Sequence, residues 1–331
     1  MFTHLLVPLD GSALAECVLP HVVAFARSFQ ARVTLLHVLD DEGFAEQDRP
    51  VDPLEWHLRK SEFQAYLDEV GKRLAAVGVE TEKVILEGEP AQTIIDFARS
   101  QAVDLIVLSS HGKSGLNPWN VSNLVHKVVQ RAITSLLIVR AYRTELCELG
   151  EFRYRRILLP LDGSVRAENV LAAATALAEA SDATLVVAHV LPQLELVARE
   201  PLSAQDRQLV EQVRERNRRE AEAYLEQLAA RLPSNTSRHL LVSDDVEAAL
   251  HDLVMEESID LVILSAHGYS GQPRWPVGSV TANFIMYGTT PLLIVQDLGP
   301  DQQALLFAEH IAHQQGGVRI HVSRTSAHPT E

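Results

Sequence analysis

One segment in the second half of the chain has residue types and spacing that suit phosphate binding. Its residues of interest are Ser265, Gly268, Gly271, Gly278 and Ser279. Glycines allow backbone amides to approach a phosphate closely. Gly278 and Ser279 also begin a predicted helix, whose N-terminus offers free amides and a favourable dipole to an anion. The spacing therefore predicts a phosphate cradle.

An acidic residue follows the first predicted strand of each half. Asp10 and Asp162 each come directly after a run of apolar residues, at the kind of strand end where open parallel sheets bind ligands. Each acid is followed by Gly and Ser, and Ser12 and Ser164 suit the N-cap of the next helix. A turn with a helix cap is one interpretation, but it does not explain why both halves place an acid there.

The chain contains the same domain-sized pattern twice. Residues 6–12 (LVPLDGS) recur as residues 158–164 (LLPLDGS), and a Ser-x-His-Gly-x-Ser-Gly loop follows each copy. Asp10 and Asp162 are separated by 152 residues, and His111 and His267 by 156, so the second copy holds four extra residues. Solenoid repeats are shorter, at roughly 20 to 50 residues. We therefore expect two units, each with its own core.

Composition and charge exclude several classes of protein. The chain has 29 Lys and Arg against 44 Asp and Glu, and this excess of negative charge disfavours nucleic acid as a partner. It lacks the uninterrupted run of about 18 apolar residues that a membrane span needs. Residues 1–8 resemble a strand rather than a signal peptide. Cys17 and Cys147 lack metal-type spacing, so we expect reduced thiols in a cytoplasmic protein.

Apolar runs of strand length alternate with helical patterns in both copies. This order predicts an α/β fold of two tandem doubly wound domains, each a five-stranded parallel sheet with helices on both faces. The predicted strands of the first copy are residues 5–9, 33–39, 82–86, 105–108 and 136–139, and its predicted helices are residues 13–29, 53–77, 90–100 and 121–131. Those of the second copy include strands at residues 157–161, 184–191, 238–242, 261–264 and 292–295 and a long, charged helix at about 202–232.

The repeat also sets the expected domain boundaries. The first domain is predicted over residues 1–142 and the second over residues 153–297, with a short charged linker between them. Residues 298–331 have no counterpart in the first half. They are predicted to form a short helix up to Gln315 followed by a polar, disordered tail.

These motifs resemble those of the universal stress protein family along nearly all of residues 1–296. The nucleotide signature of that family is Gly-x2-Gly-x9-Gly-Ser/Thr after the fourth strand, with an Asp after the first strand. The second copy reads Ser265-x2-Gly268-x9-Gly278-Ser279 and departs from the signature at its first position. The first copy reads Ser109-x2-Gly112-x9-Ser122-Asn123 and has lost the last Gly-Ser pair as well.

The resemblance implies a nucleotide-binding α-hydrolase-like fold and a site for ATP or a related adenine nucleotide, with or without Mg²⁺. It implies that Asp162 contacts the nucleoside, that the backbone around Val190 reads adenine, and that the glycines and Ser279 hold phosphates. The expected binding residues of the second half are Pro160, Leu161, Asp162, Ser164, Val190, Ser265, His267, Gly268, Gly271, Gly278, Ser279 and Val280. Weaker counterparts in the first half are Asp10, Ser12, Val38 and Gly112.

The two copies are not expected to bind equally. Ser122 places a side chain where the backbone of Gly278 would approach a phosphate, so ATP is expected mainly in the second half. Alternatively, Lys113, which stands where the second copy has Tyr269, supplies a charge that restores phosphate binding to the first half. Gly112-Lys113-Ser114 looks like the end of a Walker loop, but Val107 stands in place of its first glycine.

Other conspicuous residues have simpler interpretations. His37 and His189 lie in apolar strands and are predicted to be structural, whereas His111 and His267 either face the ligand or brace the loop. Each loop also contains a tryptophan, Trp119 or Trp275, which either covers a nucleotide or packs the loop.

The sequence leaves three functions open. The first is an ATP-binding stress-response or regulatory protein in which nucleotide acts as a conformational switch on an unidentified protein partner. The second is a protein-interaction scaffold that binds no nucleotide. The third, a slow ATPase, is the least supported, since no general base or Ser-His-Asp arrangement can be named. Since family members dimerise through their last strand, pairing of residues 136–139 with 292–295 would make an intramolecular pseudo-dimer, and a homodimer is the alternative.

Overall fold

The protein is represented by a computed structural model that describes residues 1–40, 53–113, 115, 121–141, 149–193, 203–268 and 277–297. Gly271, both loop tryptophans, Cys147 and the predicted C-terminal extension lie outside the described residues. Within the described part, no helix is long and apolar enough to cross a bilayer.

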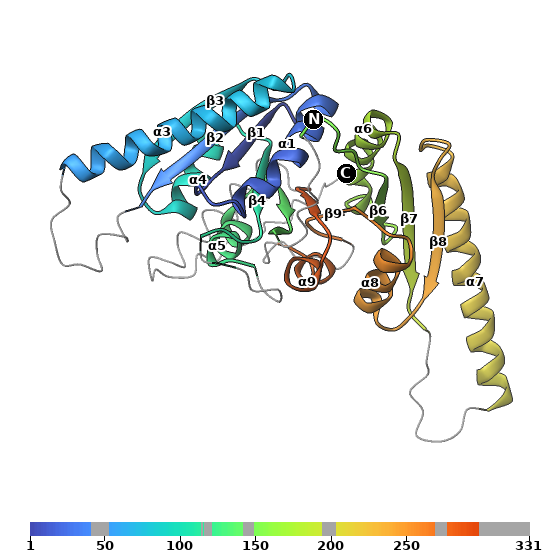
Figure 1. Cartoon of the computed structure of the whole chain (residues 1–331). Coiled ribbons are helices and arrows are strands. Elements are labelled where there is room, and N and C mark those ends of the chain that lie inside the picture. Colours follow the sequence, from blue (N-terminus) through green and yellow to red (C-terminus); the bar gives the residue numbers. More distant parts are fainter. Residues whose placement is uncertain are drawn as a thin grey trace, which may run out of the picture. The chain divides into compact units, whose positions relative to one another are not determined.

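The first half alternates strands and helices as the sequence predicts (Figure 1). Its strands are β1 (His4–Pro8), β2 (Arg32–Leu39), β3 (Thr81–Glu87), β4 (Leu105–Ser109) and β5 (Ser135–Val139). Its helices are η1 (Ala15–Val18), α1 (Leu19–Phe29), α3 (Pro53–Ala76), α4 (Pro90–Ser100) and α5 (Asn123–Arg131).

The second half repeats this order. Its strands are β6 (Arg156–Pro160), β7 (Thr184–Leu191), β8 (Ser237–Val242), β9 (Leu261–Ser265) and β10 (Leu292–Val295). Its helices are η3 (Ala167–Val170), α6 (Leu171–Ser181), α7 (Ala204–Ala229), α8 (Val246–Glu256) and α9 (Ser279–Tyr287).

The predicted helix at residues 13–29 is in fact two helices. Ser12 O accepts hydrogen bonds from the amides of both Ala15 and Glu16, so the chain leaves the turn as a 3₁₀ turn before α1 begins at Leu19. The second half has the same break between η3 and α6. The first turn of each helix is therefore tighter than the periodicity of apolar residues predicts.

Within the described residues, the strands form one ten-stranded sheet with the order β3-β2-β1-β4-β5-β10-β9-β6-β7-β8. The strands within each half are parallel, whereas β5 and β10 pair antiparallel, with Leu137 opposite Leu293. The pairing within one chain that the sequence suggests for residues 136–139 and 292–295 is thus present.

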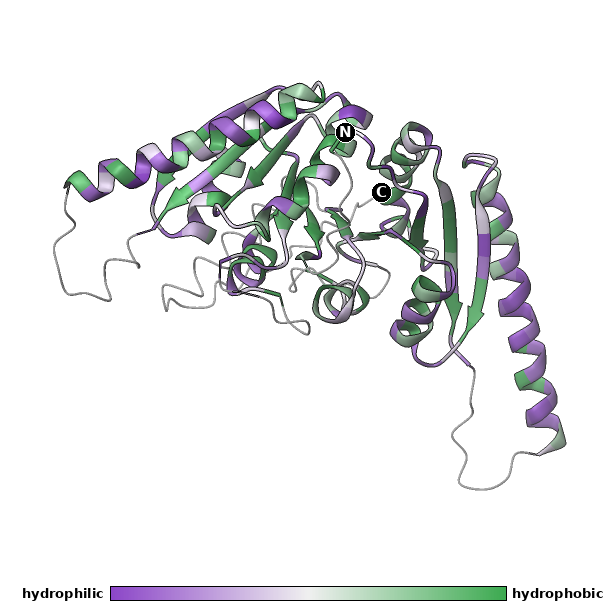
Figure 2. Ribbon diagram, in the orientation of Figure 1, coloured by the Kyte–Doolittle hydropathy of each residue, from purple (hydrophilic) through white to green (hydrophobic). Residues whose placement is uncertain are grey.

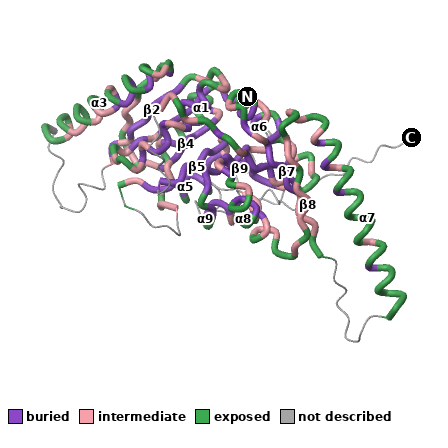
Figure 3. The backbone as a smooth tube through the Cα atoms, turned by 45° about the vertical axis from the view of Figure 1, so that its right-hand side comes forward, coloured by how far each residue is buried: buried purple, intermediate pink, exposed green. Residues whose placement is uncertain are grey.

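Apolar side chains cover both faces of the sheet, because successive residues of a strand point to opposite sides. Leu5 and Val7 pack in a cluster with residues of α1, α3 and α6, whereas Leu6 packs with residues of α4, α5, α8 and α9. Both clusters contain residues from both halves. The central strands are apolar in Figure 2 and buried in Figure 3, whereas the edge strands β3 and β8 are only partly buried and much of α3 and α7 is exposed.

In each half the order of strands reverses beside the first strand. The chain passes from β1 to β2 on one side and later places β4 on the other, and β6 lies likewise between β7 and β9. Such a switch in strand order leaves a crevice beyond the carboxyl ends of the two central strands. We call this part of each half the rim, meaning the residues that follow β1 and β4 or β6 and β9, together with the ends of β2 or β7.

Candidate functional site

The acid of the second rim is held by a turn. Pro160 ends β6, and the amide of the buried Leu161 donates to Ala188 O over 2.8 Å, so the chain stays beside β7 until Asp162. Asp162 Oδ1 accepts from the amide of Ser164 over 2.9 Å. Ser164 Oγ accepts from the amide of Ala167 over 3.1 Å. The turn expected from the sequence is present, and Ser164 accepts an amide hydrogen bond at the start of η3, but the N-cap residue of η3 is Arg166.

Gly268 lies directly against this carboxylate. A Cβ atom at Gly268 would collide with Asp162 Oδ2, so any other residue would have to push the acid away. Gly112 and Asp10 have the same relation in the first half. In both halves, glycine at this position therefore leaves room for the carboxylate of the acid.

Helix α9 begins beside Gly268. The amide of Gly278 donates to Ala266 O over 2.7 Å, which ties the start of the helix to the loop after β9. Thr281 Oγ1 in the first turn also donates to Ser265 O over 3.0 Å. A Cβ atom at Gly278 would lie 3.9 Å from the amide nitrogen of Gly268, so the two glycines are neighbours in space.

The N-terminus of α9 has no side-chain cap. Gly278 is the N-cap residue, with φ at −71°, and Ser279 is exposed. A Cβ atom at Gly278 would have Ala266 O as its nearest atom, at 3.7 Å, which is ordinary van der Waals contact. Neither backbone conformation nor packing therefore requires glycine here, and its absence of a side chain leaves the first amides of the helix open to an anion.

The first half closes the same position. Ser122 is the N-cap of α5, and its Oγ accepts from the amide of Val125 over 3.4 Å. The amide of Ser122 donates to Ser110 O over 2.9 Å, as Gly278 does to Ala266. Asn123 then occupies the place of Ser279. The first half therefore uses its own side chain where the second half leaves amides open.

The acid of the first rim is also engaged. Asp10 Oδ1 accepts from the amide and the hydroxyl of Ser12, over 2.9 and 2.6 Å, and Oδ2 accepts from the amide of Lys113 over 2.8 Å. Lys113 Nζ lies over the ring of Phe63 in α3, 4.8 Å from its centroid. This contact gives the lysine a partner other than phosphate.

The histidines expected to be structural hydrogen-bond to the turns after the first strands. His37 Nδ1 and His189 Nδ1 each lie 2.7 Å from a carbonyl, that of Leu9 and that of Leu161 respectively. Burial is the main cause that lowers the pKa of His37. A neutral imidazole that donates from Nδ1 fits this geometry. Val38 and Val190 come directly after them and are half-buried, packed against the core cluster of α4, α5, α8 and α9.

The two loop histidines, His267 and His111, have different hydrogen-bond partners. His267 Nδ1 lies 2.8 Å from Asp297 Oδ1, and both side chains are 1% exposed, so His267 braces the loop against the residue two positions after β10. In the first half, His111 Nδ1 lies 3.0 Å from Ser110 Oγ, and Ala141 stands where Asp297 would be. The sequence did not anticipate the buried His267 to Asp297 pair, because Asp297 lies just beyond the repeated motifs.

Two further expected residues lie in the first turn of α9 and at the end of β9. Val280 is half-buried against the core. Ser265, which replaces the first glycine of the signature, is 7% exposed, and its Oγ has no hydrogen-bond partner among the described residues. Within that part of the chain, no three His, Cys, Asp or Glu side chains are grouped so that they would hold a metal ion.

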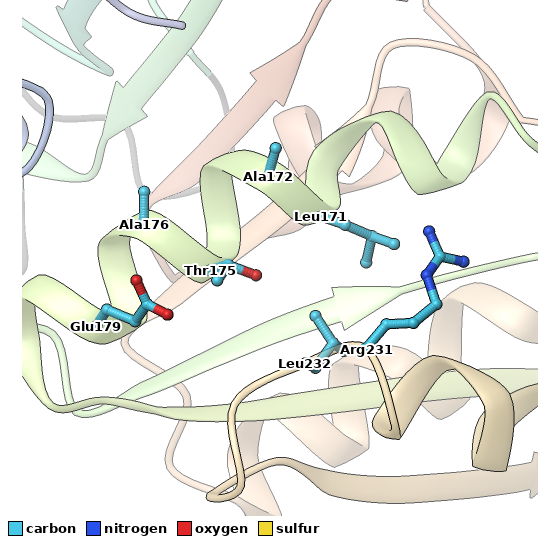
Figure 4. A pocket seen from close by; sticks show the side chains of 7 residues that line it. All are labelled: Leu171, Ala172, Thr175, Ala176, Glu179, Arg231 and Leu232. Carbon is cyan, nitrogen blue, oxygen red and sulfur yellow. The ribbon is translucent and has the colours of Figure 1, made fainter.

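A separate hollow lies on helix α6, between it and the residues that follow α7 (Figure 4). Leu171, Thr175 and Glu179 of α6 face Arg231 and Leu232 there. No residue of the expected nucleotide site lines it. The candidate site is therefore the second rim, where Asp162, Gly268 and Gly278 come together.

Comparison with known proteins agrees with the repeat. The model of the family described as the universal stress protein family matches residues 1–140 and again residues 153–296. Universal stress protein MJ0577 of Methanocaldococcus jannaschii is 28% identical over 155 residues, which cover 42% of this chain and 96% of that protein.

Two solved structures cover both halves. A universal stress protein from Archaeoglobus fulgidus is 16% identical with a TM-score of 0.64, over 90% of this chain and 100% of the other. A functionally unknown protein, PA1789, from Pseudomonas aeruginosa is 15% identical with a TM-score of 0.66, over 95% of this chain and 98% of the other. At this identity the likeness shows a shared fold.

Proposed function

Because the chain belongs to the universal stress protein family, with a match in each half, we propose that it binds ATP in its second half and acts as a nucleotide-dependent regulatory protein. The observation that carries the proposal is the contrast between Gly278 and Ser122. Both begin the last helix of their half, but only Ser122 caps the amide of its own first turn.

The second rim has the donors that a nucleotide phosphate needs. The uncapped start of α9 faces the Gly268 backbone, and the macrodipole of the helix favours negative charge at that end. Asp162 is exposed beside Gly268, in a position to accept a hydrogen bond from a ribose hydroxyl. Mg²⁺, where bound, would be held by phosphate oxygens in addition to protein oxygens, and Asp162 is the nearest carboxylate to the cradle.

Nucleotide would act as a conformational switch through the second rim. A phosphate held near Gly268 and Gly278 would change the surface that this rim offers to a protein partner. Hydrolysis is not included, because no side chain of the described rim is placed as a general base for an attacking water.

The scaffold function is favoured by one observation, the replacement of the first signature glycine by the buried Ser265. Its side chain adds bulk at the end of β9, next to the proposed phosphate cradle. The two functions differ in whether the purified protein binds adenine nucleotide at all.

The test combines released nucleotide with direct titration. The purified protein is denatured, and any nucleotide in the supernatant is identified by chromatography; ATP affinity of the emptied protein is then measured by calorimetry. We expect ATP binding in the wild type and at least tenfold weaker binding, about 1.4 kcal/mol, in Gly278→Ser. Absence of released nucleotide together with absence of binding at millimolar ATP would establish the scaffold function instead.

A further inference from the structure

Phe63 of α3 fills the rim of the first half. Its ring is stacked on that of His37, with centroids 3.4 Å apart and an interplanar angle of 17°. A Cβ atom at Gly11 would lie 3.0 Å from Phe63 Cε1. Lys113 Nζ lies 4.8 Å from the centre of the same ring. The half-buried phenyl ring therefore touches three segments of the rim.

These three segments are the ones that enclose the crevice. Gly11 follows β1, His37 lies near the end of β2, and Lys113 follows β4. The crevice at a switch in strand order is the place where open α/β sheets hold ligands. Burial lowers the pKa of His37, so the imidazole is neutral and its face is available for stacking. Phe63 thus occupies the first rim as a planar aromatic ligand would.

The corresponding position of the second half has no aromatic ring. Residues 62–67 (EFQAYL) align without a gap with residues 220–225 (EAEAYL), so Ala221 takes the place of Phe63. The structure supports this alignment, because an arginine ten residues after each of these positions makes the same ion pair, within α3 in the first half and just after α7 in the second. Arg73 binds Glu16 over 2.6 Å, and Arg231 binds Glu168 over 3.0 Å.

The second rim is more open than the first around the residues that Phe63 contacts in the first half. No atom of the described residues lies within 4 Å of a Cβ atom built on Gly163, the counterpart of Gly11. His189 is half-buried, whereas His37 is 5% exposed. The nearest ring to His189 among the described aromatic pairs is that of Tyr224, edge-on at 5.9 Å.

We propose that Phe63 is a built-in occupant of the first rim, and that it excludes the nucleobase which the second rim accepts over Ala221. The inference rests on the proposed function and deepens it, since it names the side chain that decides which half takes a base. Two residues of the first half would then oppose nucleotide binding separately. Ser122 closes the phosphate cradle, and Phe63 fills the place of the base.

This separation predicts what the first half binds once the ring is removed. Phe63→Ala would free the faces of His37 and the backbone beside Val38, which are suited to a planar base. The cradle remains closed by Ser122. The opened first rim should therefore bind adenosine and ATP with affinities within about threefold of each other, because Ser122 already occupies the amide of Val125 at the start of the helix. The second rim should prefer ATP by tenfold or more.

The experiment is calorimetric titration of the full chain with adenosine and with ATP, for the wild type and for Phe63→Ala. We expect one ATP site per chain in the wild type and one additional site for either ligand in the variant. A folded Phe63→Ala protein, with a wild-type circular dichroism spectrum, that gains no adenosine site would overturn the inference. Absence of ATP binding in the wild type would instead reject the proposed function.

The reciprocal variant removes any dependence on the folding of Phe63→Ala. Ala221→Phe places a ring in the second rim, and we expect its affinity for ATP to fall about tenfold or more while its circular dichroism spectrum is unchanged. Ala221 is itself buried, so Ala223→Phe, on an exposed position of the same helix, controls only for adding a ring to α7 and should keep wild-type affinity. Folded Ala221→Phe protein with unchanged affinity for ATP would contradict the proposal.

Discussion

Ser122 and Gly278 occupy one position in the two halves, and the difference between them is one hydroxymethyl group. In Ser122 this group caps α5 through the amide of Val125. At Gly278 the protein has room for a side chain, because a Cβ atom there would lie 3.7 Å from its nearest neighbour. A residue that neither folding nor packing demands is the kind that a ligand selects.

This reasoning gives a prediction about stability and binding together. Gly278→Ser should leave the free energy of unfolding unchanged or raise it by a few tenths of a kcal/mol, because serine is the better N-cap. The same change should weaken ATP binding. Urea unfolding and calorimetric titration of one preparation measure both quantities, and a clear loss of stability would show that the glycine has a structural role instead.

His21 offers a prediction about pH. Its Nδ1 lies 2.7 Å from Tyr154 Oη, and complete burial lowers the pKa of His21 to about 3. Since the unfolded chain has a pKa near 6.5, it binds a proton that the folded protein excludes between these values. The stability contributed by neutral His21 is therefore complete above pH 6.5 and is lost as the pH falls towards 3.

We expect the fall in Tm between pH 7 and pH 5 to be smaller in His21→Phe than in the wild type, even if the variant is less stable at pH 7. Each pH unit below 6.5 costs the wild type about 1.4 kcal/mol through this group. His57→Phe, at an exposed position, is the control and should keep the wild-type pH profile. An unchanged difference in Tm for His21→Phe would show that the imidazole is not the titrating group.

At the scale of the elements, helix α9 has different surroundings at its two ends. Its N-terminus has no side-chain cap and lies in the proposed site. Its C-terminal carbonyls accept hydrogen bonds from Arg140, which follows β5 of the other half. Arg140 is 3% exposed, and its guanidinium donates to Phe284 O over 2.6 Å and to Ile285 O over 3.1 Å. A cation at this end also suits the helix dipole.

Arg140→Gln should therefore lower the free energy of unfolding by about 1–3 kcal/mol, because buried carbonyls of α9 lose their donor. Ser135→Ala is the control at the same junction, because Ser135 Oγ accepts from the amide of Gln296, which follows β10, over 3.1 Å. Denaturant unfolding of both variants measures the difference. Equal losses would mean that Arg140 contributes no more than any other contact at the junction.

Most elements were predictable from sequence, because strands and helices alternate with clear apolar periodicity and the rim motifs recur after the same strands. The occupant of the first rim was not predicted. Phe63 and Ala221 are 158 residues apart, whereas the flanking motifs are separated by 152 or 156, so the substitution becomes visible only when α3 and α7 are aligned by themselves. Which ring a helix brings to the rim depends on how it packs on the sheet, and periodicity does not specify that.

At the scale of the whole repeat, the two halves share one sheet and both hydrophobic clusters. If one half unfolded, apolar side chains of the other half would become exposed in both clusters. We therefore expect residues 1–297 to unfold in one cooperative transition, with equal calorimetric and van't Hoff enthalpies. Differential scanning calorimetry measures this ratio, and two resolved transitions would show that the halves are independent folding units.

The halves are thus alike in fold and different at the rim. Both halves keep the acid and the close glycine, but only the second half leaves the N-terminus of its last helix without a side-chain cap; in the first half Ser122 caps this helix and Phe63 lies in the rim. Under the proposed function, the second half would bind nucleotide, and the first half supports it through β5 and Arg140.

The stoichiometry of ATP binding tests this account most directly. Titration of the full chain, after removal of any bound nucleotide, should give one high-affinity site per chain, and Asp162→Ala should abolish it. Two equal sites per chain, or one site that Asp162→Ala leaves intact, would contradict the assignment of ATP to the second half.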